Sequence, residues 1–78
     1  MKAEEIGKRL EILIGDKDKK QVATDLNVSY SALRMYLTGK RVPKDEVKVR
    51  IARYFNKTVD EIFFADDEHE TYSNKEVG

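Results

Sequence analysis

Apolar residues recur along this chain at the three- and four-residue intervals of an amphipathic helix. The first stripe predicts a helix over residues 3–14, with Ile6, Leu10, Leu13 and Ile14 on one face. Further stripes predict four more helices, over residues 19–26, 29–38, 44–55 and 59–64. No segment alternates with the period of two expected of a strand. The pattern therefore predicts a compact all-α domain of five helices.

Residues suited to helix ends separate these stripes. Gly15 follows the first helix, where a left-handed C-terminal cap is wanted. Asp18 with Gln21 predicts a capping box for the second helix. Asn27 ends that helix, because asparagine tolerates a positive φ. Ser29 is predicted to cap the third helix and Gly39 to end it. Thr58 with Glu61 predicts a capping box for the fifth helix.

The second and third predicted helices satisfy the demands of a helix-turn-helix. Ala23 is small enough for a close helix crossing, and Asn27 can take the left-handed conformation in the turn. Both helices and the turn also need an apolar interior, which is provided by Val22, Leu26, Val28, Leu33 and Tyr36. The alternative is a plain helical hairpin in a small bundle.

The outer face of the third predicted helix favours DNA recognition over the plain hairpin. A step of about 100° per residue turns four side chains outward, namely Ser31, Arg34, Met35 and Thr38. Such side chains can form hydrogen bonds, carry positive charge or touch a thymine methyl, as recognition in the major groove requires. No acidic residue lies between Asp25 and Asp45. This one-sided stretch favours a surface that faces phosphate.

The net charge of zero is an average over two unlike parts. Residues 1–65 carry 14 Lys and Arg against 10 Asp and Glu, a net charge of +4. Residues 66–78 carry one Lys against five acidic residues, a net charge of −4, and lack a helical period. The sequence therefore predicts a DNA-binding domain over 1–65, followed by a flexible acidic tail over 66–78.

The composition argues against several other classes of protein. There is no cysteine, and the single histidine, His69, cannot form a metal site unaided. We expect no metal, no cofactor and no enzymatic activity, since no nucleophile, base and orienting group are brought together. Because no long apolar run or signal peptide is visible, we expect a cytoplasmic protein with no membrane partner.

Three segments of the chain resemble the lambda-repressor/Cro family of regulators, also called the XRE family. They are IGKRL, VATDLNVSYSALRMYLTGKRVP and TVDEIFF, which lie between residues 6 and 64. The resemblance implies a five-helix lambda-repressor-like fold, a homodimer, and control of transcription from a two-fold operator on double-stranded DNA. Within this family, repression is the commoner mode of control.

The resemblance also implies roles for individual residues. Tyr30, Ser31 and Met35 match positions that approach base edges, and Ser29 and Ala32 match positions that meet the DNA backbone or a methyl group. The positions that match phosphate contacts are Lys19, Lys40 and Arg41.

One departure from the family concerns an ion pair. The family's recurrent glutamate before the glycine is Leu37 here, and its arginine partner corresponds to Ile14. Replacing a buried ion pair by two apolar residues is often neutral or stabilising, so we expect the fold to be kept.

The end of the last predicted helix carries a candidate dimer contact. Phe63 and Phe64 are adjacent, so a short helix cannot bury both in one core. The outward one, with Ile62 nearby, could form a two-fold contact. The alternative function is that of an antitoxin or phage accessory protein, whose main role is to bind a protein partner through this aromatic pair and the acidic tail.

Overall fold

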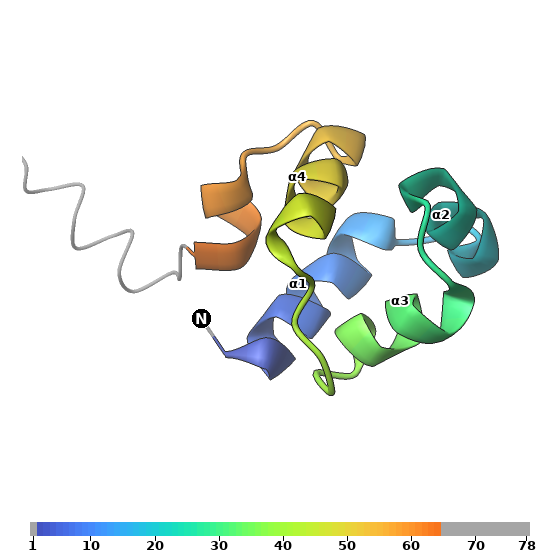
Figure 1. The fold of residues 1–78 in the computed structure, drawn as a ribbon, viewed down its shortest axis with the longest axis horizontal. Helices are drawn as coiled ribbons and strands as arrows, with labels where there is room; N and C mark the ends of the chain where they lie inside the picture. The colour runs from blue at the N-terminus through green and yellow to red at the C-terminus, as the bar shows by residue number, and fades with distance from the viewer. Residues whose placement is uncertain (1, 65–78) are drawn as a thin grey trace, which may run out of the picture.

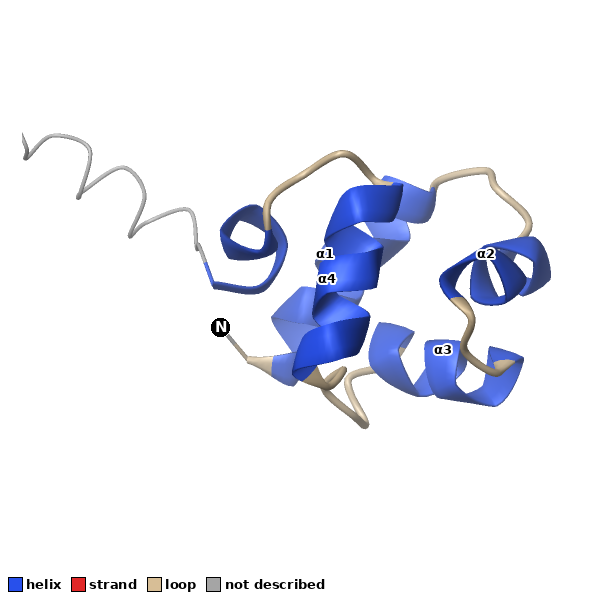
Figure 2. Cartoon of the chain, turned by 45° about the horizontal axis from the view of Figure 1, so that its top comes forward, coloured by secondary structure: helices blue, strands red, loops and turns tan. Residues whose placement is uncertain are grey.

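The computed structural model describes residues 2–64, which form five consecutive helices and no strand (Figures 1 and 2). The helices are α1 (Ala3–Ile14), α2 (Lys19–Leu26), α3 (Tyr30–Leu37), α4 (Asp45–Tyr54) and the π-helix η1 (Asp60–Phe64). The predicted all-α, five-helix fold is confirmed. The predicted acidic tail, residues 66–78, lies outside the described residues.

Helix α1 runs through the middle of the molecule (Figure 1). It packs against α3 on one side and against η1 on the other, and α2 packs against both α3 and α4. The helix-turn-helix pair and η1 therefore lie at opposite ends of the described domain, as both ribbon views show (Figures 1 and 2).

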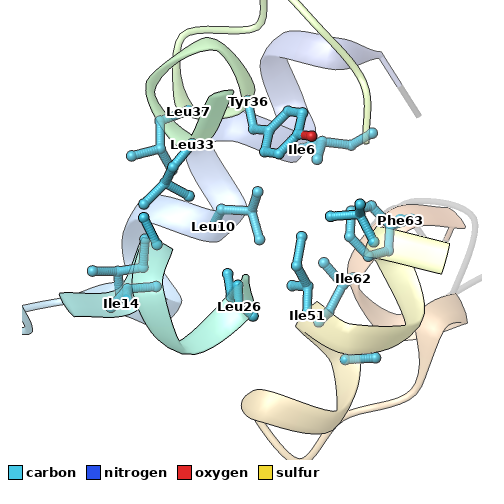
Figure 3. Packing of buried hydrophobic residues seen from close by; sticks show 14 residues of the cluster. Ile6, Leu10, Ile14, Leu26, Leu33, Tyr36, Leu37, Ile51, Ile62 and Phe63 are labelled. Carbon is cyan, nitrogen blue, oxygen red and sulfur yellow. The ribbon is translucent and has the colours of Figure 1, made fainter. Parts of the chain in front are cut away.

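All five helices contribute to a single apolar core. Figure 3 shows Leu10 of α1 near the middle of this core, with side chains of α3 on one side and of α4 and η1 on another. Within residues 2–64, no polar or charged residue is buried. Ile14 and Leu37, which stand where the family has an ion pair, are both core residues. Apart from the hydroxyl of Tyr36, the core side chains therefore need no hydrogen-bond partners.

The crossing of α1 and α3 depends on Gly7. A Cβ atom at this position would lie 2.4 Å from the carbonyl oxygen of Leu37 and 2.8 Å from that of Tyr36. Both neighbours are backbone atoms, so a side chain here would force the two helices apart. The lack of a side chain at Gly7 lets the last turn of α3 lie directly against α1.

Three helices end in the Schellman motif, in which a residue with positive φ lets the following amide donate to a carbonyl five residues earlier. The positive-φ residues are Asn27 after α2, Gly39 after α3 and Asn56 after α4, with φ of 61°, 80° and 58°. The closing N–O distances are 3.0, 2.9 and 2.9 Å. Asn27 and Gly39 were predicted to end their helices. At Gly15 the left-handed cap was a wrong prediction, because φ is 55° but ψ is −124°.

The two predicted capping boxes have different outcomes. The Thr58–Glu61 box is complete: the Thr58 amide donates to Glu61 Oε1 at 2.8 Å and the Glu61 amide to Thr58 Oγ1 at 3.0 Å. The Asp18 carboxylate accepts from the Lys20 amide at 3.0 Å, but Gln21 donates to Asp25 instead of returning to Asp18. Asp18 therefore caps α2 through the Lys20 amide alone, and the predicted Asp18–Gln21 box is not formed.

The last helix differs from its prediction in type and in what it buries. It is a π-helix, in which each turn holds more residues than an α-turn, so neighbouring side chains point in more similar directions. Ile62 and Phe63 are both 1% exposed, whereas Phe64 is 53% exposed. The predicted dimer contact is corrected accordingly: Ile62 and Phe63 belong to the core, and only Phe64 is available to a second copy.

Candidate nucleic-acid interface

The turn between α2 and α3 fixes where the second helix of the pair begins. Ser29 is extended, with φ −72° and ψ 155°, and its Oγ accepts from the Ala32 amide at 2.9 Å. This bond satisfies one of the amides that the first turn of a helix leaves without a partner. Ser29 is therefore engaged as a helix cap, and Ala32, which is half-buried, packs against the core.

Helix α3 separates an apolar inner face from a polar outer face. Leu33, Tyr36 and Leu37 are buried. The four side chains predicted to face outward are all exposed, namely Ser31, Arg34, Met35 and Thr38. The inner face anchors α3 on α1 and α2, and the outer face is left open to a ligand.

The outer face of α3 is hollowed. An open depression of about 280 Å³ is lined by Ser31, Arg34, Met35, Thr38 and Lys40. The Thr38 hydroxyl already donates to the Arg34 carbonyl at 3.0 Å, so towards a ligand it can only accept. The depression therefore combines a cation, an apolar thioether and small polar groups, the mixture that base edges and thymine methyls require.

The basic loop after α3 is folded back on the helix that it follows. The amides of Lys40 and Arg41 both donate to the Met35 carbonyl, at 2.9 and 3.3 Å. Gly39 allows this bend, and a Cβ there would lie 2.9 Å from Glu4 Cγ and 3.0 Å from Glu4 Cα. Both basic side chains are exposed, and Lys40 lines the depression.

The start of α2 carries two adjacent lysines with different surroundings. Lys19 Nζ lies 3.4 Å from Glu11 Oε1, so its charge has an acidic neighbour on α1. The Asp18 carboxylate caps the helix by accepting from the Lys20 backbone amide. Lys20 Nζ lies 5.6 Å from the centroid of the Tyr30 ring on α3.

Tyr30 is also contacted from its own helix. The guanidinium carbon of Arg34 lies 5.9 Å from the ring centroid of Tyr30, one helical turn earlier. The ring is 38% exposed. Two cations from two helices thus lie against one aromatic ring at the N-terminal end of α3, within the distance at which a ring quadrupole attracts a cation.

Helix α4 supports the turn from behind. Arg50 Nε donates to the Leu26 carbonyl at 2.9 Å, next to the turn residue Asn27. The Tyr54 hydroxyl donates to Asp25 Oδ2 at 2.9 Å, and this hydrogen bond is the main reason why the pKa of Tyr54 is raised. Arg50 was not among the residues singled out from the sequence. A donor on a later helix that reaches back 24 residues leaves no local sequence signal.

A capped helix pair with a polar, basic outer face on its second helix defines a helix-turn-helix DNA-binding domain. Comparison with family models gives the same answer: a helix-turn-helix model matches residues 15–62, more than half of the chain. The protein belongs to this family of XRE-type DNA-binding transcriptional regulators, as the resemblance implied. No curated protein and no solved structure gave a match.

The comparison covers α2, α3, α4 and the start of η1, and leaves all of α1 outside. None of the helices in residues 2–64 has both the length and the apolar character needed to span a bilayer.

Proposed function

We propose that this protein is a transcriptional repressor that binds a two-fold operator as a homodimer and excludes RNA polymerase from the DNA it covers. The observation that carries the proposal is the outer face of α3, where Ser31, Arg34 and Met35 are exposed together around one depression. An α-helix with such a face fits the major groove, where every base pair presents its own pattern of donors, acceptors and methyl groups.

In this proposal the affinity comes mainly from phosphate contacts. Lys40 and Arg41, whose amides fold back on the Met35 carbonyl of α3, would contact the DNA backbone that flanks the groove. Lys19 contacts a phosphate by leaving its ion pair with Glu11 and pairing with the phosphate instead. An exposed ion pair of this kind contributes only about 0–1 kcal/mol, so the exchange costs little. These contacts fix the position of α3 and are insensitive to sequence.

Sequence preference comes from the side chains at the depression and at the start of α3. Tyr30 and Met35 offer apolar surface to thymine methyl groups, and Ser31 offers a hydroxyl that can donate or accept. The Ser29 hydroxyl accepts an amide at the helix cap, and Ala32 is half-buried, so these two residues contribute mainly to the position of the helix.

The proposed dimer forms through the surface around Phe64. This side chain is the exposed one of the aromatic pair, and Lys48 Nζ lies 4.9 Å from its ring centroid. A two-fold contact here would leave α2 and α3 free, since they lie at the other end of the domain (Figure 1). Each subunit would then meet one half-site of a symmetric operator.

The experiment that tests the proposal is a selection of binding sites from random duplex DNA at about physiological salt, where non-specific affinities are only ~10⁻⁴ to 10⁻⁶ M. A two-fold symmetric motif is expected. Recovery of DNA without any motif would contradict the proposal and would favour the alternative of a protein-binding module.

Two substitutions then test the docking face on the selected operator. Arg34→Ala and Lys19→Ala are expected to weaken binding without unfolding the protein, because neither residue is part of the core. Lys57→Gln is a matched control, since Lys57 is exposed and lies between α4 and η1. Unchanged operator affinity in both test variants would remove α3 and the start of α2 as the docking face.

A further inference from the structure

Lysine 20 was not among the residues that the sequence singled out, yet it is the lysine of α2 that reaches towards α3. Its Nζ lies over the ring of Tyr30, the first residue of α3. In a helix-turn-helix, the first residues of the second helix approach the bases while the first helix crosses the DNA backbone. The Lys20 ammonium is thus a charge of α2 that is held over the leading end of α3.

Lys20 differs from its neighbour Lys19 in having no acidic side chain of the described domain within ion-pair distance. Lys19 is paired with Glu11, and Asp18 is engaged with a backbone amide. Within residues 2–64, Lys20 makes no ion pair, and its ammonium contacts only the face of an aromatic ring. A cation–π contact restrains the position of an ammonium group without neutralising its charge.

We propose that Lys20 contacts a DNA phosphate and that the Tyr30 ring is its positioning residue. The ring holds the ammonium near the place where a phosphate flanks the groove, so less side-chain freedom is lost when DNA binds. Arg34 lies against the same ring and is restrained in the same way from within α3. This inference rests on the proposed DNA-binding function and names a contact that the function alone does not identify.

The first test compares the salt dependence of DNA binding for the wild-type protein and Lys20→Gln. Each phosphate contact contributes about 0.9 to the slope of log affinity against log salt on duplex DNA. A bound dimer carries two copies of Lys20, so the Lys20→Gln slope is expected to be shallower by about 1.8, and its affinity at 0.1 M salt to be roughly 60-fold lower. The loss should be equal on the selected operator and on an unrelated duplex, and Lys57→Gln should retain the wild-type slope.

The second test separates the ring of Tyr30 from its hydroxyl and from any base contact. Binding is measured on the unrelated duplex, where base recognition does not contribute. Tyr30→Phe keeps the ring and is expected to bind as the wild type does. Tyr30→Leu is expected to bind roughly two- to fivefold more weakly for each subunit on the DNA, the range of a cation–π contact at an exposed site. The loss of affinity caused by Tyr30→Leu should be smaller in the Lys20→Gln background than in the wild type.

The outcomes distinguish this inference from the proposed function. An unchanged slope in Lys20→Gln overturns the phosphate contact, even where the wild-type protein selects a clear operator. Equal affinities for Tyr30→Phe and Tyr30→Leu, or an equal Tyr30→Leu effect in both backgrounds, overturn the positioning role. The absence of a selected motif overturns the proposed function instead. The salt dependence on unrelated DNA still tests whether Lys20 contacts a phosphate. Thermal unfolding of each variant confirms that the fold is intact.

Discussion

At one end of the molecule α3 divides its residues between a buried and an exposed face, and at the other end η1 turns two of its last three residues inward. Leu33 and Tyr36 anchor α3, while Ser31 and Arg34 remain exposed. Among the last three residues of η1, Phe64 is the exposed one. The regular α-helix keeps two clean faces, one for packing and one for a ligand. Both helices bury adjacent side chains, Tyr36 and Leu37 in α3 and Ile62 and Phe63 in η1, but η1 leaves the bulky ring of Phe64 exposed beside them.

The two ends also differ in how they are held in place. The α2–α3 end is fixed by capping residues within it and by Arg50 and Tyr54 of α4 behind it. The η1 end has its complete capping box and a contact from α1, in which the Arg9 side chain donates to the Glu61 carbonyl. Local signals thus define both helix starts, but long-range contacts set the position of each end.

The largest expected loss of stability comes from a substitution in η1. Phe63→Ala should destabilise the domain by about 3–5 kcal/mol, because it leaves a cavity where a large buried ring was lost. Phe64→Ala should change the stability of the monomer little, since its ring is 53% exposed. Urea unfolding of both variants measures the difference. Similar losses for the two rings would contradict the inward and outward assignment.

The next effect concerns the contact that holds α3 on α1. Gly7→Ala would normally stabilise a helix by up to about 1 kcal/mol. Here we expect it to cost roughly 1–3 kcal/mol, because the new Cβ would collide with backbone carbonyls of α3. Thermal unfolding shows whether Gly7→Ala raises or lowers the stability. Lys8→Ala, at the exposed neighbouring position, serves as the control and should be nearly neutral.

A smaller effect tests the start of α3. Ser29→Ala should lower stability by about 1 kcal/mol, because the Ala32 amide loses its acceptor. Ser31→Ala removes a hydroxyl from the exposed outer face and should have little effect on stability. Chemical denaturation of the two variants compares them directly, and equal stabilities would show that the cap contributes nothing.

The smallest effect is the pH dependence of the η1 capping box. The Thr58 amide donates to the Glu61 carboxylate, which lowers the pKa of Glu61 below its ordinary value of 4.5. A lowered folded-state pKa adds stability above the ordinary pKa, and this stability is lost as the pH falls through the folded value. Unfolding midpoints of the wild type and Glu61→Gln should therefore converge below pH ~4.5. A constant gap down to pH ~3 would rule out the ionised carboxylate as its source.

Features that depend on residues close together in the sequence were predictable, and features that depend on contacts between distant residues were not. The bounds of α1 and α2, the turn at Asn27 and the cap at Ser29 depend on residues a few positions apart, and they were predicted correctly. The inward position of Ile62 depends on how η1 lies against α1, which periodicity alone does not reveal. The wrong assignment of Gln21 arose because Asp25, four residues later, competes for its amide.

The candidate interface was predictable as a surface but not in its internal contacts. The outward residues of α3 follow from helical periodicity, and all four are exposed. The partner of Lys19 on α1 and the approach of Lys20 to Tyr30 join different helices, so they depend on packing angles. Adjacent lysines look equivalent in a sequence, and the structure gives them opposite surroundings.

The hydrogen bond from Arg50 to the Leu26 carbonyl has a consequence for genetics. A screen for alleles that lose DNA binding would be expected to return Arg50 alongside residues of the outer face of α3. Substitution of Arg50 would have the same phenotype as substitution of a residue that contacts DNA, although the Arg50 side chain binds the protein backbone. Its signature is a loss that a distant stabilising mutation suppresses, whereas an allele at a true contact stays defective in that background. A map of suppressible alleles would thus trace the support of the turn rather than the footprint on DNA.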